Sequence, residues 1–308
     1  MVTAGCGSVP ETVQGYPLRA FLICMVAYTT AQMDLALFGY AVPAIRAEFE
    51  LTLSEVMAIV STAFLIGGAL LLAISWMGDR VGRLPMFQFS LLGSSVLVTL
   101  ISVAPGVMVL TLLRGASIAV GGLSYPITGA IITEEMPARL RGLFMGLLQI
   151  GYPLGWALAS LWSMWLLTTY GWRPLFLVGL ISLPMVWVVR HYLREPPRAI
   201  TAKSEQAPAA LADLWAAGIR LRAATLFSAQ FLFVWAYAAS IFLFPSFLRD
   251  VRGLDAFNFS LLIGAGNGIG VLGYVLAAWI GERVWTRRNT VVLWTLLGSI
   301  LFQVLVWV

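Results

Sequence analysis

Two ionisable side chains stand in the middle of apolar stretches, and both are of types that carry or bind charge. Asp34 lies within TTAQMDLALFGYAVPAI, residues 29–45, and Arg114 is the one cation inside an apolar segment. A carboxylate at the centre of a bilayer costs roughly 2.5 to 3.5 kcal/mol, so Asp34 should face a cavity or a partner. Loss of water favours its protonated form, which suits a proton carrier, whereas a nearby cation would hold the negative charge.

Further polar and aromatic side chains fall at helical spacing on shared faces of the apolar segments. Such stripes could contact a polar ligand, although hydrogen bonding between neighbouring helices explains each of them equally well. The candidate ligand contacts, besides Arg114, are Tyr125, Gln149, Tyr152, Gln230, Tyr237 and Asn267.

The elements that must position these residues are membrane helices. The chain has 308 residues, of which 60% are hydrophobic and 11% charged, with a mean hydropathy of +0.90. A helix needs roughly 20 apolar residues to cross a bilayer, and alternating strands of barrel type are absent from the pattern. The sequence therefore predicts an all-helical membrane protein with spans near residues 18–44, 54–77, 85–104, 107–133, 142–168, 173–193, 223–247, 258–281 and 290–308.

The basic residues between these spans predict the orientation. Apart from Arg114, only Arg46, Arg173, Arg249 and Arg252 lie away from the side on which the chain begins. Because positive loops stay in the cytoplasm, the amino terminus is expected inside, at the cell inner membrane. The pI near 9.5 reflects this asymmetry, so nucleic-acid binding is not expected. The cysteine pattern predicts no metal site, and the first apolar run is expected to be a retained helix.

One long connection divides the chain into two unequal parts that resemble each other. Residues 194–222 are rich in proline, alanine and charge, and they separate a six-helix unit, residues 1–193, from a three-helix unit, residues 223–308. GDRVGR at 78–83 recurs as GERVWTRR at 281–288, and Pro43 of AVPAIR has a counterpart in Pro245 of LFPSFLR. These landmarks predict parallel repeats.

The segment SWMGDRVGR strongly resembles the loop between the second and third spans of the major facilitator superfamily of secondary transporters. Asp79, Arg80, Gly82 and Arg83 match the motif of that family. The resemblance implies a gate in which this loop pairs with charges after the fourth span, among them Glu134, Glu135, Arg139 and Arg141, and breaks on rocking. The alternative is a simple positive anchor for topology.

Other stretches resemble the sialic-acid, aromatic-acid and related carboxylate:proton symporters of that superfamily. The match includes Asp34 and Glu48 in the first span, YGWRPLF at 170–176 and LREPPR after the sixth span, but Ala31 replaces a usual acid. Asp34 and Arg114 lie ~15 Å and ~12 Å from the same end of their spans. Since spans one and four of this fold line a central cavity, Arg114 is expected to bind a substrate carboxylate while Asp34 takes up the proton.

The sequence thus predicts a helical bundle of major facilitator type with an incomplete carboxy-terminal half. The expected function is proton-coupled symport of a small organic anion by a monomer in the lipid bilayer, without enzymatic activity, cofactor or metal. Two alternatives stay open. One is proton-driven drug or metabolite efflux, which GYPLG, residues 151–155, weakens without excluding, because Tyr152 interrupts the antiporter motif that it loosely resembles. The other is a truncated remnant that does not transport, which a chain ending in its ninth span would fit.

Overall fold

The structure, a computed structural model, describes residues 15–195 and 218–307, apart from the side chains of residues 76–80, 235–242 and 306. Every regular element in those residues is helical, which confirms the predicted fold class. The first six predicted spans correspond to α1 Tyr16–Glu48, α2 Leu53–Val81, α3 Arg83–Ile101, α4 Val107–Gly122 with α5 Ser124–Glu135, α6 Arg141–Leu148 with α7 Gly151–Thr169, and α8 Trp172–Leu175 with the 3-10 helix η1 Phe176–Ser182 and α9 Leu183–Tyr192. The last three correspond to α11 Arg220–Asp250, α12 Ala256–Arg283 and α13 Arg287–Trp307.

The helices are long enough and apolar enough to cross a membrane. Within the described residues, 8 helical segments meet that standard of length and hydropathy. The seventh predicted span coincides with α11, a helix of 31 residues, part of whose side chains lie outside the description. Helices satisfy their own backbone groups, which hydrocarbon cannot do. Pro43 inside α1 and Pro245 inside α11 each remove one such bond, and neighbouring groups in a membrane helix bundle can satisfy the freed carbonyl.

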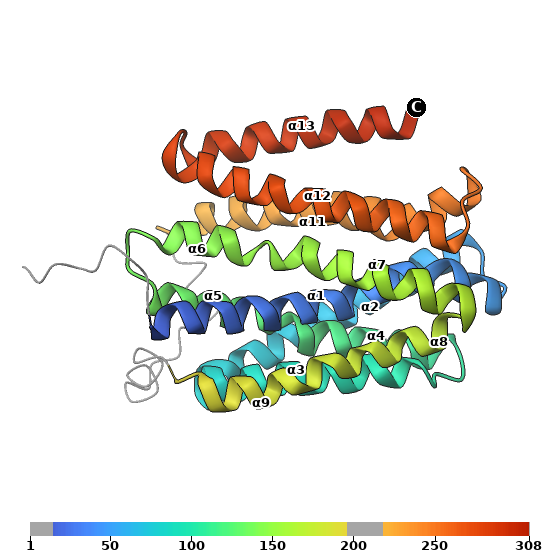
Figure 1. The fold of residues 1–308 in the computed structure, drawn as a ribbon, viewed down its shortest axis with the longest axis horizontal. Coiled ribbons are helices and arrows are strands. Elements are labelled where there is room, and N and C mark those ends of the chain that lie inside the picture. The colour runs from blue at the N-terminus through green and yellow to red at the C-terminus, as the bar shows by residue number, and fades with distance from the viewer. Residues whose placement is uncertain (1–14, 196–217, 308) are drawn as a thin grey trace, which may run out of the picture.

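The helices run side by side and define two ends (Figure 1). The end at which α1 begins, on the left of the figure, also carries Arg83 and Arg287, and is called the basic end below. In this view α13 forms one edge of the bundle, α12 lies next to it, and α9 forms the other edge. Helix α1 runs through the interior, where it contacts α7, α5, α11 and η1.

The apolar core belongs mainly to the first six spans. One cluster near the basic end includes Phe21, Phe87 and Ile131, and a second toward the opposite end includes Leu37 and Phe176. In the most apolar stretch of α1, 61% of the residues are buried, against 6% in both α12 and α13. The α12 and α13 helices therefore present most of their side chains outward.

The second half meets the first along two lines. Helix α12 packs against α7 and α6, and α11 packs against α1. At the end opposite the basic end, Arg46 forms an ion pair with Asp250, and Arg249 Nη1 donates a 2.8 Å hydrogen bond to the Pro43 carbonyl oxygen. Most of the predicted central loop, residues 194–222, lies outside the described residues, so the domain boundaries stay a prediction.

Candidate functional site

Asp34 is buried deep within the first half of the bundle. Its side chain projects from the middle of α1, and the residue is only 2% exposed. One carboxylate oxygen, Oδ2, accepts a 3.0 Å hydrogen bond from the Ser182 hydroxyl at the end of η1. The other, Oδ1, is buried and has no hydrogen-bond partner among the described residues. Such a half-satisfied buried carboxylate is costly in its charged form.

Arg114 is the corresponding buried cation. It projects from α4, is 2% exposed, and donates a 2.8 Å hydrogen bond through Nη2 to the carbonyl oxygen of Leu35. Its guanidinium carbon lies 4.6 Å from the centre of the Phe38 ring. Among the described ion pairs, none joins Arg114 to Asp34. The hydrogen-bond partners of the two charged side chains are separate, Leu35 for Arg114 and Ser182 for Asp34.

The two charged residues border the same cavity. It has a volume of about 280 Å³ and lies between α1, α2, α3 and α4. The Asp34 and Arg114 side chains line it together with Gln32, Ser94 and Ser117. The cavity therefore lies among helices of the first half, and its walls include spans one and four, which the resemblance placed around a central cavity.

Close packing of α1 against α7 comes from the GYPLG segment. A Cβ on Gly155 would lie 2.6 Å from the Thr29 carbonyl oxygen and 2.7 Å from the Met33 nitrogen. A Cβ on Gly151 would lie 2.7 Å from the Tyr28 ring. Small residues four apart allow two helix backbones to approach closely in a membrane. GYPLG has a packing role here, which accounts for its glycines without an antiport function.

Three of the predicted ligand contacts gather where α1, α5 and α7 meet. The Gln149 side chain accepts a 3.2 Å hydrogen bond from the Tyr28 hydroxyl and donates one of 3.0 Å to the Tyr125 hydroxyl oxygen. Tyr152 stacks on Trp156, with ring centres 6.0 Å apart. Tyr28 had not been predicted, because one tyrosine in an apolar helix gives no periodic signal.

The remaining predicted contacts belong to the second half, and of these Gln230 and Asn267 are not among the residues that line the Asp34 cavity. Gln230 is exposed on α11, and the side chain of Tyr237 lies outside the described residues. Asn267 donates a 2.9 Å hydrogen bond to the Ile263 carbonyl of its own helix. It lines a largely apolar groove of about 980 Å³ formed by α7, α11, α12 and α13.

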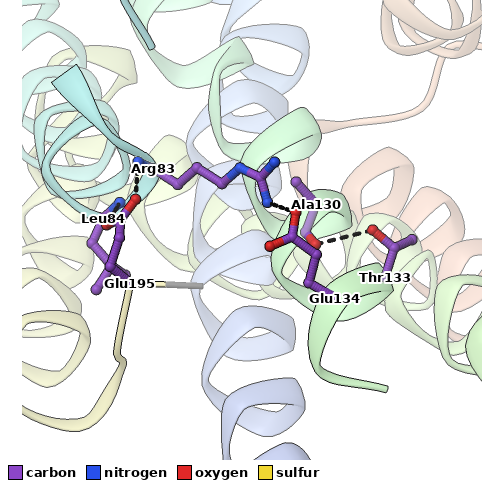
Figure 2. A network of polar contacts seen from close by, with 6 residues as sticks. All are labelled: Arg83, Leu84, Ala130, Thr133, Glu134 and Glu195. Atoms are coloured by element: carbon purple, nitrogen blue, oxygen red, sulfur yellow. Dashed lines mark hydrogen bonds and ion pairs between the residues drawn. The ribbon is translucent and has the colours of Figure 1, made fainter. Parts of the chain in front are cut away.

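One predicted gate residue, Arg83, lies in a polar network with Glu134 and Glu195 (Figure 2). Arg83, the first residue of α3, forms an ion pair with Glu134 near the end of α5. Glu195 accepts hydrogen bonds from the backbone nitrogens of Arg83, at 2.6 Å, and Leu84, at 3.0 Å. Gly82 has a φ of 111°, so it makes the turn into α3 that brings these amides toward Glu195. A carboxylate at the first turn of a helix is stabilised by the free amides and the helix dipole.

Sequence patterns identified only part of this gate network. Glu195 was missed as a site residue, and its one signal was its place in LREPPR just after the sixth span. The ion pair uses Glu134, whereas Glu135 and Arg139 take part in no described ion pair. The side chains of Asp79 and Arg80 lie outside the described residues.

The repeated motif of the second half meets the first half at the same end. Glu282 and Arg287 form an ion pair with a distance of 2.8 Å. Both side chains lie directly beside Gly142 at the start of α6. The position in the second half that corresponds to Asp79 therefore touches the first half. No group of three or more metal-ligating side chains occurs in the described residues.

Comparison with known proteins identifies the family. The model of the Major Facilitator Superfamily matches residues 24–308. The chain belongs to this superfamily. It is 27% identical to the cis,cis-muconate transport protein of Acinetobacter baylyi over 87% of its own length, and 25% identical to the gallate transporter of Pseudomonas putida over 89%. Among solved structures, a bacterial homologue of the human lysosomal transporter Spinster shares the fold, with a TM-score of 0.62, 19% identity and 90% of this chain covered.

The matched relatives are longer than the chain. The alignments span 67% of the muconate protein, 69% of the gallate transporter and 64% of the Spinster homologue, and less than half of several other curated relatives. The superfamily and its named members are transporters rather than enzymes, which agrees with the expected class. The predicted multi-pass membrane helix bundle is confirmed.

Proposed function

We propose that the protein takes part in secondary active transport of a small organic anion, a carboxylate or an aromatic acid, together with protons. The names of the muconate and gallate relatives support an anionic, unsaturated substrate. Transport would follow alternating access, by a monomer in the cell inner membrane. The amino terminus would lie in the cytoplasm, because the basic end carries the larger share of arginines.

The observation that carries this proposal is a buried acid and a buried base on one cavity without an ion pair between them. A buried carboxylate outside an ion pair is relieved of its burial cost when it takes up a proton. A guanidinium whose described contacts are a carbonyl oxygen and a ring face can bind the carboxylate of a ligand through charge-assisted hydrogen bonds. We therefore assign proton coupling to Asp34 and anion recognition to Arg114.

The test is uptake of labelled muconate and benzoate into proteoliposomes under an imposed pH gradient. Asp34→Asn should abolish accumulation above the external concentration, since no proton can be taken up there. Arg114→Lys should weaken apparent anion affinity by about tenfold, because a bidentate contact is lost. The exposed residues Glu50 and Arg19 provide matched controls, and Glu50→Gln and Arg19→Lys should behave as wild type.

Two results would contradict these assignments. Gradient-driven accumulation that survives Asp34→Asn would remove the coupling role, and unchanged anion affinity in Arg114→Lys would remove the recognition role. Expulsion of a cationic dye, with no anion accumulation, would replace the proposal by the efflux alternative.

We infer further that the network at the basic end holds the gate. The contact of Glu282 with α6 joins the two halves, which rocking would separate. The pair of Arg83 with Glu134 and the contact of Glu195 with α3 hold helix ends of the first half in place at the same end of the bundle. Glu134→Gln should lower maximal uptake severalfold with an unchanged KM, because the pair is remote from the cavity.

The exchanged pair, Arg83→Glu with Glu134→Arg, should recover part of that loss. The control is Glu48→Gln, which breaks a pair with Arg173 whose members are 41% and 38% exposed. Exposed pairs contribute little, so uptake should not change. Equal losses in the Glu134 and Glu48 variants would argue against the gate.

A further inference from the structure

Four tyrosines from both halves of the molecule converge on one place. Tyr28 of α1 lies 5.8 Å, centre to centre, from the ring of Tyr125 of α5. Tyr152 of α7 packs against the apolar cluster that contains Tyr28. On α12, a Cβ on Gly270 would lie 4.0 Å from Pro153, and Ala278 meets Gly146, so Tyr274, midway between them, comes opposite Gln149. These four residues with Gln149 are called the tyrosine cluster below. Because Tyr274 comes from the second half, the cluster spans the line where the halves meet.

The cluster lies at mid-membrane depth. Counted from Tyr16, Glu135 and Arg283 at the basic end, Tyr28, Tyr125 and Tyr274 lie roughly 14 to 18 Å along their helices. Tyrosines normally gather at the two membrane surfaces, where the hydroxyl reaches water. Their place at mid-membrane depth is explained if these tyrosines contact a polar ligand there or line its path.

The exposure of the rings differs in a way that suits a binding surface. Tyr28 is 4% exposed and fixed by its bond to Gln149, whereas Tyr125 and Tyr274 are 43% and 38% exposed. Gly151 makes room for the Tyr28 ring, and Gly146 brings α6 against Ala278 of α12, one turn from Tyr274. A rigid buried member thus supports two rings that are free to meet a ligand.

The chemistry of the cluster specifies the kind of ligand. Its members carry phenol and carboxamide groups and no formal charge, so it offers ring faces and hydrogen-bond donors. Aromatic rings stack on planar rings, and hydroxyl donors bond carboxylate or hydroxyl oxygens. Tyr28 is two turns, or ~10 Å, from Leu35, whose carbonyl accepts the bond from Arg114. A single-ring acid does not reach both, so its contacts with the cluster and with Arg114 are successive.

We propose that the tyrosine cluster is a ring-recognition subsite for planar conjugated organic acids, with Tyr28 and Tyr274 as residues that determine specificity. The role of this subsite in transport rests on the proposed function, whereas binding of an acid to the subsite is measurable without transport. Pattern alone did not assign a role to Tyr28.

The test compares benzoate with cyclohexanecarboxylate, which has the same charge and a similar size but no planar ring. Isothermal titration of the full chain in detergent should show a preference for benzoate of about threefold to tenfold. Tyr274→Leu should abolish the preference, whereas Tyr274→Phe, which keeps the ring, should retain it. Tyr125→Phe should weaken both acids without changing their ratio. Tyr170→Leu, at the far end of α7 with a 61% exposed ring, should have no effect.

Equal affinity of the wild type for the two acids, or a preference that survives Tyr274→Leu, would overturn the proposal. The Tyr274→Phe variant separates ring recognition from damage to the fold. A preference that behaves as expected in a protein without gradient-driven accumulation would leave the subsite intact and reject the transport function. Gradient-driven accumulation without a preference for benzoate would support the transport function and reject the subsite.

Discussion

On one face of α1, the Asp34 carboxylate and the Arg114 guanidinium border an open volume of about 280 Å³. On the other face, α7 comes so close that a Cβ on Gly155 would lie 2.6 Å from the α1 backbone. One helix thus meets its neighbours loosely where it carries charge and tightly where it carries tyrosine. The difference separates two tasks, since a charge that binds and releases a proton needs room, whereas rings that recognise a ligand need fixed positions.

Gly155→Ala tests the face of α1 that packs tightly against α7. It should lower stability more than Ser182→Ala, which tests the face that carries Asp34. The new methyl group would meet Thr29 and Met33 backbone atoms, which cannot move aside as a flexible side chain would. Overpacking of this kind costs on the order of 1 to 3 kcal/mol. Thermal unfolding in detergent should therefore show a lower Tm, and ligand binding by the tyrosine cluster should weaken.

The matched control for Gly155→Ala is Gly266→Ala in α12, where nothing lies within 4 Å of the added carbon. Alanine is the better helix former, so this variant should be as stable as the wild type or slightly more stable. If the two variants unfolded at the same temperature, the contrast between the two faces of α1 would be wrong.

The sequence was sufficient to predict the helices and to place the Asp34 and Arg114 side chains beside one cavity. Apolar length fixed the spans, and equal depth placed Asp34 and Arg114 together. It was not sufficient for the direction of Asp34, because α1 is apolar around its whole circumference and has no stripe to mark the face toward α7. Contacts between distant segments, such as Glu195 with α3, depend on tertiary packing that local patterns do not encode.

Second-half candidates show the same limit. Helical spacing made Gln230 and Asn267 candidate ligand contacts, yet Gln230 is exposed on α11 and Asn267 bonds the Ile263 carbonyl of its own helix. Periodicity states which residues share a face, and the structure states what that face meets.

Ser182→Ala tests the loose face and should have the smaller effect. The Ser182 hydroxyl is fully buried and donates to Asp34 from a different segment, so its removal leaves a second carboxylate oxygen without a donor. With the carboxyl protonated, which loss of water favours, this hydrogen bond contributes about 0.5 to 1.5 kcal/mol, less than overpacking at Gly155 costs. Ser163→Ala is the matched control, because that buried serine bonds only the Ala159 carbonyl of its own helix, 2.8 Å away.

A double-mutant cycle followed by thermal unfolding separates the two serines. The loss of stability caused by Ser182→Ala should largely disappear when Asp34 is already alanine, whereas the loss caused by Ser163→Ala should be the same with or without Asp34. Full additivity of Ser182→Ala with Asp34→Ala would show that the hydroxyl does not support the carboxylate, and the loose face would then hold Asp34 by packing alone.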